Sequence, residues 1–138
     1  MQIAMELALA DADLPPSAIG YVNAHATGTE HGDIAESQAT RNVFGANVPV
    51  SSLKSYMGHT LGACGALEAW IGIEMMRADW FAPTINLARL DPRCAELDYI
   101  VGAGRKLQCE YVMSNNLDRK STRLNSSHIQ KSRMPSSA

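Results

Sequence analysis

Apolar and polar positions follow a helical period at the start of the chain and then change to short extended runs. Within residues 3–12, the side chains of Ile3, Leu7 and Ala10 fall on one face at helical spacing, which predicts a helix. The prolines of "DLPPSAIG" end that helix, because proline cannot continue the hydrogen-bond ladder. The run "IGYVNAH" that follows is short and apolar, which predicts a buried strand.

The middle of the chain predicts two more helices and a second strand. Asp33 can cap a helix over residues 34–44, with Glu36 as its capping-box partner and Gly45 at its end. "VPVSSL" predicts a strand, and residues 59–80 are expected to form the longest helix of the chain.

The expected helix over 59–80 has almost no side-chain bulk in its first turns, where Gly62, Ala63, Gly65 and Ala66 lie. Glycine costs roughly 1 kcal/mol relative to alanine inside a helix, so close packing against a sheet or a symmetry mate must compensate. "APTINL", "LDYIVG" and "LQCEYVMS" add extended segments. Strands that alternate with helices predict an α/β layered fold.

Composition narrows the class of protein. The chain has 138 residues, of which 46% are hydrophobic, and its mean hydropathy is −0.14. No apolar stretch approaches the roughly eighteen residues that a membrane span needs, and the acidic N-terminus is unlike a signal peptide. Three cysteines without metal-ligand spacing predict a reducing compartment, with no disulfide framework and no metal site. We therefore expect a cytoplasmic protein.

Charge is distributed unevenly along the chain. Residues 1–117 hold 7 Lys/Arg and 13 Asp/Glu, a net charge of −6, whereas residues 118–138 hold 5 Lys/Arg and one Asp, a net charge of +4. An acidic body followed by a basic, serine-rich tail indicates that the two segments do not belong to one native domain.

Three titratable side chains stand where strands or loops end: His25 after "YVNA", Lys54 after "SSL" and His59 after "MG". Strand ends are where α/β folds expose reactive groups. At the start of the expected helix, the positive end of the helix dipole favours a neutral His59, which can still donate one hydrogen bond to a developing oxyanion. Each residue alone is more often structural or solvated, but together with "HATGT" they indicate an active site.

The stretches "VNAHATGTEHGDIAES" and "SLKSYMGHTLGACGALEA" resemble the two C-terminal signatures of the β-ketoacyl-acyl-carrier-protein synthases. These condensing enzymes have a thiolase-like layered α/β fold, in which a mixed sheet packs between helices. The resemblance implies that residues 1–117 are the C-terminal half of such a domain, incomplete at both ends. It also implies a decarboxylative Claisen condensation of malonyl-carrier protein with an acyl thioester, in fatty-acid or polyketide synthesis.

The resemblance assigns roles residue by residue. It implies that His25 and His59 polarise the malonyl thioester and stabilise its enolate, and that Lys54 orders the site electrostatically. It implies that the hydroxyls of Thr27 and Thr29 hold the phosphopantetheine arm of acyl carrier protein. The reaction needs no cofactor held by the protein, and "GHTLGACG" lacks the spacing of a nucleotide-binding loop.

Further expectations follow from the same resemblance. Glu36, eleven residues after His25, matches a buried acid that organises the lysine and a nearby loop. The family's nucleophilic cysteine has no counterpart here, since Cys64 matches a buried helix position and Cys94 and Cys109 lack a neighbouring base. The chain alone is therefore expected to be inactive, whereas the parent enzyme is expected to be a homodimer that binds acyl carrier protein and no nucleic acid.

The tail after "VMSNN" departs from the family, which continues with a phenylalanine- and glycine-rich loop. Residues 118–128 can be written as codons of a common short-read sequencing adapter, and "SRMPSSA" fits its later constant part. We therefore predict that residues 118–138 are a non-native, disordered tail. The rival interpretation is a basic disordered arm that binds nucleic acid or an acidic carrier protein.

Two alternatives to a condensing enzyme remain open from the sequence. One is a non-catalytic partner subunit resembling a chain-length factor, although such partners typically lose the set of His25, Lys54 and His59. The other is an orphan fragment without a stable fold, because an edge strand and a buried helix without their complement expose apolar surface.

Overall fold

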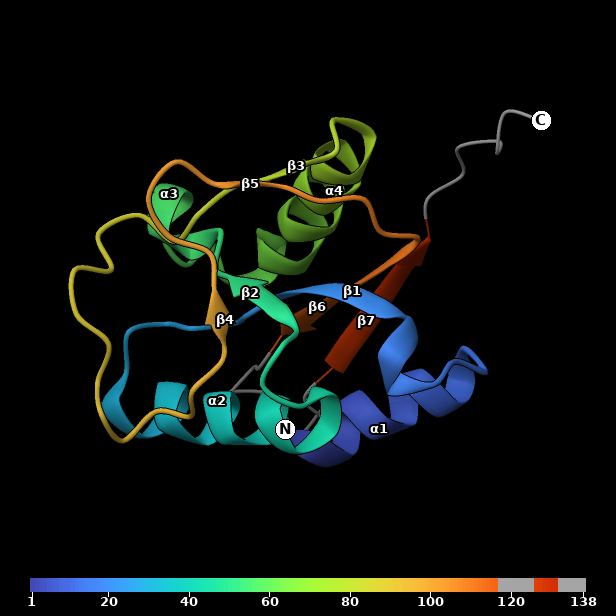
Figure 1. The fold of residues 1–138 in the computed structure, drawn as a ribbon, viewed down its shortest axis with the longest axis horizontal. Helices are drawn as coiled ribbons and strands as arrows, with labels where there is room; N and C mark the ends of the chain where they lie inside the picture. Colours follow the sequence, from blue (N-terminus) through green and yellow to red (C-terminus); the bar gives the residue numbers. More distant parts are fainter. Residues whose placement is uncertain (117–125, 132–138) are drawn as a thin grey trace.

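A sheet of five strands organises the residues that the computed structural model describes, 1–116 and 126–131 (Figure 1). The helices are α1 (Gln2–Asp11), α2 (Glu30–Phe44), α3 (Lys54–Met57) and α4 (Cys64–Arg77), with the 3-10 turns η1 (Pro16–Ala18) and η2 (Leu61–Ala63). The strands are β1 (Ile19–Asn23), β2 (Pro49–Ser51), β3 (Trp80–Phe81), β4 (Asp98–Tyr99), β5 (Arg105–Lys106), β6 (Tyr111–Asn116) and β7 (Ser126–Lys131).

The strand order across the sheet is β4-β2-β1-β6-β7. β1 pairs in parallel with both β2 and β6, and β2 pairs in parallel with β4, whereas β7 runs antiparallel to β6. A separate two-stranded antiparallel pair joins β3 and β5. The sheet is therefore mixed, as expected, and its parallel strands end at the same edge.

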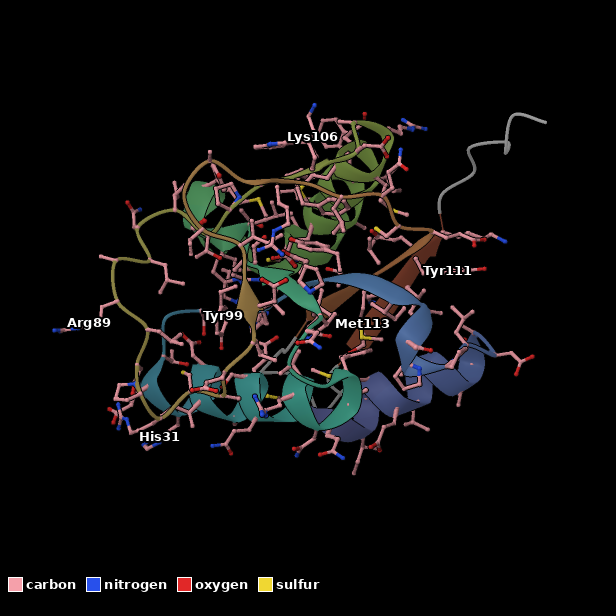
Figure 2. The ribbon with its side chains drawn as sticks, in the orientation of Figure 1. His31, Arg89, Tyr99, Lys106, Tyr111 and Met113 are labelled. Carbon is pink, nitrogen blue, oxygen red and sulfur yellow. The ribbon has the colours of Figure 1, made fainter. Side chains whose placement is uncertain are left out.

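Helices cover both faces of the sheet, with α1 and α2 on one side and α4 on the other (Figure 1). The first core includes Met5 and Leu9 of α1 with Val22 and Met113 of the sheet. Figure 2 shows Met113 between the sheet and the first two helices. The second core joins α4 to the opposite face through residues that include Met75, Met76, Tyr21 and Val112. This arrangement confirms the predicted incomplete α/β layered fold.

β1 occupies the centre of the sheet, with strands on both of its edges. Four of its five residues are buried, because both faces of the sheet are covered, as is usual for parallel strands. Gly20 is required there by close approach, since a Cβ at this position would lie 2.2 Å from Cβ of Cys109.

Two predicted helix boundaries are wrong. The helix expected over 59–80 begins at Cys64, because the chain takes positive φ values at Gly58 (68°) and Leu61 (52°), which a continuous helix cannot include. The longer helix is α2, which starts at Glu30 with Thr29 as its N-cap, so Asp33 lies inside the first turn and does not cap it.

The apolar face predicted for the first helix is not the buried one. Met5 and Leu9 are buried, whereas Ile3 and Leu7 are 70% and 60% exposed. The reason is that α1 packs against α2 and β7 through the Met5–Leu9 side.

The expectation of disorder is wrong for residues 126–131, which form β7. β6 offers unpaired backbone N–H and C=O groups at its edge, and residues 126–131 pair along its whole length. Ile129 also packs against the first core opposite Met113. The rest of the predicted tail lies outside the described residues, and its origin in an adapter stays a prediction. No helix of the described part of the chain is long and apolar enough to cross a membrane.

Candidate active site

The predicted site forms where β1, β2 and β6 end at one edge of the sheet. His25 follows β1 by two residues, and Lys54 follows β2 by three. The imidazole rings of His25 and His59 lie edge to face, with their centroids 5.2 Å apart and an interplanar angle of 87°. The structure thus brings together both histidines that the sequence singled out.

Two carboxylates of α2 hold the turn that carries His25. Oε1 of Glu36 accepts the backbone N–H of His25 at 2.8 Å, and its Oε2 accepts that of Ala26 at 2.9 Å. The carboxylate of Asp33 accepts backbone N–H groups from residues 27–29. These bonds hold Ala26 at a φ of 28°, which a residue with a Cβ rarely adopts. The predicted role of Glu36 in organising this loop fits that geometry.

Burial dominates the titration of both carboxyl groups. Desolvation raises the pKa of Glu36, while the N–H donors from Ala26 and His25, an amide from Asn115 and the charge of Lys54 act in the opposite direction. Burial likewise raises the pKa of Asp33 against the N–H groups that it accepts. The turn therefore depends on two acids that burial makes harder to ionise.

Glu36 was expected to organise Lys54, but the two residues interact only through their charges, and the ion-pair partner of Lys54 is a different acid. Lys54 forms an ion pair with Glu68 of α4, and both side chains are buried. Oε1 of Glu68 also accepts from the thiol of Cys64 at 3.3 Å, and Oε2 accepts from Nδ2 of Asn116 at 3.4 Å. Sequence reasoning missed Glu68. Its signal was a single acid in the otherwise apolar first turns of α4.

None of the three cysteines has the surroundings of an activated nucleophile. Cys64 is fully buried, as expected, and its sulfur donates to a carboxylate. Cys94 and Cys109 are partly buried free thiols. Burial and the nearby Asp79 raise the pKa of Cys109 to about 11, which disfavours a thiolate.

The backbone selects the tautomer of His59. The N–H of Leu61 donates to Nδ1 of His59 at 3.3 Å. Nδ1 is therefore the unprotonated acceptor, and a neutral imidazole carries its proton on Nε2. His59 lies in the loop before η2 and not within a helix as expected, so this bond, and not a helix end, orients its ring.

A cavity of about 700 Å³ opens beside these groups. Lys54, His59, Thr27 and Thr29 line it, and the buried His25 contacts the ring of His59 edge to face. The hydroxyl oxygens of Thr27 and Thr29 lie 3.3 Å apart, so the structure brings together the two predicted arm-binding residues.

The loop over residues 84–97 forms the opposite wall of the cavity. Nη1 of Arg93 in this loop bonds Oε1 of Glu30, at the start of α2, at 2.5 Å. The same guanidinium also bonds Asp91. The loop is therefore tied to the helix that holds the His25 turn.

The arrangement is suited to stabilising negative charge on an oxygen atom. It offers an Nε2 donor on His59, a second imidazole in contact with the first, and a buried ammonium group whose charge Glu68 balances. Among the described residues, no group of three or more His, Cys, Asp or Glu side chains could hold a metal ion.

Comparisons with known proteins identify the family to which the chain is similar. Residues 1–88 match the model of the β-ketoacyl synthase C-terminal domain. The chain is 40% identical over 116 residues to a 3-oxoacyl-[acyl-carrier-protein] synthase 2 of Synechocystis, a match that covers 82% of this chain and 28% of the relative. It is 42% identical over 106 residues to the Mycobacterium bovis synthase 2, covering 76% of this chain and 25% of the relative.

Solved structures give the same result. A β-ketoacyl synthase from Burkholderia phymatum superposes with a TM-score of 0.83 at 63% identity, covering 85% of this chain and 29% of that one. A ketosynthase in complex with its chain length factor, from Xenorhabdus doucetiae, gives a TM-score of 0.77 at 33% identity, with 83% and 29% covered. The chain thus spans little more than a quarter of the length of the relatives that it matches.

Proposed function

Because this chain belongs to the β-ketoacyl synthase family, we propose that it supplies the decarboxylating part of a condensing active site. The observation that carries the proposal is the pair of imidazoles, 5.2 Å apart, beside a buried lysine and a cavity. The reaction is the condensation of malonyl-carrier protein with an acyl thioester. The parent enzyme is an acyltransferase of fatty-acid or polyketide synthesis.

In the proposed reaction, the malonyl thioester loses carbon dioxide when its Cα–carboxylate bond breaks. The electron pair of that bond moves into the enolate of an acetyl thioester, and the negative charge gathers on the thioester oxygen. His25 and His59 donate hydrogen bonds to this oxygen, and the charge of Lys54 favours its formation. The enolate carbon then attacks the acyl thioester, a carbon–carbon bond forms, and the thiolate leaves.

Thr27 and Thr29 are proposed to bind the phosphopantetheine arm that delivers the malonyl group. Their hydroxyls line the same cavity as His59, which supports this assignment. Acyl carrier protein is therefore the proposed partner, and one structural relative was solved as a ketosynthase in complex with such a carrier. The protein itself needs no cofactor for this chemistry.

The thiol that carries the acyl chain is proposed to come from a part of the protein outside this chain. The buried Cys64 and the high pKa of Cys109 support that view. On this account the chain alone does not catalyse condensation, and the complete enzyme is a cytoplasmic homodimer. The chain-length-factor alternative has less support, because such partners typically lose the set of His25, Lys54 and His59, which this chain retains.

The test is a chimera in which residues 1–116 replace the matching segment of the Burkholderia phymatum β-ketoacyl synthase. We expect the chimera to condense acyl and malonyl groups held on carrier protein, and the isolated 138-residue chain not to do so. His25→Ala and His59→Ala should each lower the rate about 100-fold or more. A folded chimera without activity, beside an active relative, would refute the proposed function.

A further inference from the structure

Asn115 links the last parallel strand to the turn that carries His25. Its side chain is buried, with an exposed fraction of 1% for the residue. Nδ2 of Asn115 donates to Oε1 of Glu36 at 3.1 Å, and Oδ1 accepts from the hydroxyl of Ser127 at 3.0 Å. The carboxylate must accept, so the amide nitrogen is the atom that faces Glu36.

The donors around Glu36 differ in where they come from. The N–H groups of His25 and Ala26 belong to the turn that the carboxylate is holding. Asn115 belongs to β6, which pairs with β1 along the centre of the sheet. Asn115 is therefore the donor that fixes the carboxylate from the sheet, independently of the turn.

The turn needs such support because it is strained. Ala26 has a φ of 28°, and strained backbone of this kind costs about 1–3 kcal/mol unless the surroundings hold it. If the carboxyl group of Glu36 rotated or took up a proton, one of the two N–H acceptors would be lost. The direction of the His25 side chain would then no longer be set.

We propose that Asn115 is a positioning residue of the active site, which acts through Glu36 to fix the turn that presents His25. This inference rests on the proposed function for its catalytic meaning. The contacts themselves can be tested without substrate. The charged or titratable residues near Glu36 are His25, whose backbone N–H it accepts, Lys54, whose charge acts on it, Tyr99, and Asp33 of the same helix.

The experiment is an NMR titration of the 138-residue chain. The carboxyl carbon of Glu36 and the amide resonances of His25 and Ala26 are followed as the pH is raised. In the unsubstituted 138-residue chain we expect all three signals to shift with one midpoint pH, because they report one hydrogen-bonded unit. In Asn115→Ala the midpoint should rise by about one pH unit, since a donor to the ionised carboxylate is lost.

Ser114→Ala is the matched control. Ser114 is buried on the same strand and accepts a hydrogen bond from Asn23 at 3.2 Å, and within the described part of the chain no hydrogen bond joins it to Glu36. This variant should lower the melting temperature without moving the midpoint. Asn115→Asp keeps the shape and replaces the donor with an acceptor, so it should raise the midpoint even if Asn115→Ala does not fold.

A folded Asn115 variant with an unchanged midpoint, or a Ser114→Ala chain with an equal shift, would overturn the proposal. The outcome is separable from that of the proposed function. A midpoint that moves as expected, together with an inactive chimera, would preserve the positioning role and refute the condensing activity.

Discussion

Lys54 and Glu68 form an ion pair in which both side chains are withdrawn from water, with exposed fractions of 4% and 0%. The pair connects the end of β2 to α4 across the sheet edge, so it joins a candidate catalytic group to the second core. Its energetic role differs from that of an exposed ion pair, because a buried charge without its partner keeps its full desolvation cost.

Glu68→Ala should therefore destabilise the chain by about 3–5 kcal/mol. The reason is that the ammonium group of Lys54 would stay buried without its counter-charge. Urea unfolding at neutral pH measures the change, and the double variant Lys54→Met/Glu68→Leu should recover most of it. Glu74→Ala is the control, since the Glu74–Arg77 pair is exposed and should matter little. Equal losses in the Glu68 and Glu74 variants would contradict the prediction.

Glu36 should make stability fall as the pH rises through a window above its ordinary value of 4.5. Burial raises its pKa in the folded chain, so between the ordinary and the raised value the folded state holds a proton that the unfolded state has lost. The free energy of unfolding, measured by urea titration at several pH values, should decrease across this window. In Glu36→Gln that dependence should flatten, and an unchanged slope would show that another group causes it.

Gly20→Ala should destabilise the centre of the sheet. The added Cβ would lie 2.2 Å from Cβ of Cys109, and overpacking of this kind costs about 1–3 kcal/mol. Thermal unfolding measures the loss. Because the clash is with the Cβ of residue 109, the double variant Gly20→Ala/Cys109→Gly should be more stable than Gly20→Ala alone. If the double variant regained none of the lost stability, the clash with residue 109 would not be the cause of the loss.

Gln130→Met should stabilise β7. Both polar atoms of the Gln130 amide are buried without a hydrogen-bond partner, and Oε1 lies 2.7 Å from where a Cβ on Gly72 would be. Removing an unsatisfied buried amide while keeping the volume should raise the melting temperature. His128→Ala, at an exposed position of the same strand, should leave it unchanged. A lower melting temperature in Gln130→Met would indicate that the amide does find a partner.

The positions of the strands could be predicted from local sequence features. The start of the long helix could not, because it depends on the backbone conformation of the loop before it. The strands at "IGYVNAH" and "VPVSSL" are short apolar runs, and both lie in the sheet. The helix expected from residue 59 begins at Cys64 because Leu61 takes a positive φ, which apolar periodicity does not reveal.

In the candidate site, the sequence predicted the titratable residues but not the partners that they bind. His25, Lys54 and His59 were found because residues after parallel strands converge at one sheet edge. The partner of Lys54 was not found, since spacing along the chain does not show which of two buried acids, Glu36 or Glu68, lies across the sheet. Asn115 also escaped notice, because its importance depends on what its amide bonds.

The role of the two imidazoles is measured most directly by the release of carbon dioxide from malonyl-carrier protein by the chimera that contains residues 1–116. The nucleophilic cysteine of the relative's segment is blocked, so that only decarboxylation is measured. We expect that carbon dioxide is still released and that His59→Ala and His25→Ala each slow its release about 100-fold or more, whereas Lys106→Ala does not. Equal rates in the histidine variants and the unsubstituted chimera would contradict the claim that these imidazoles stabilise the enolate.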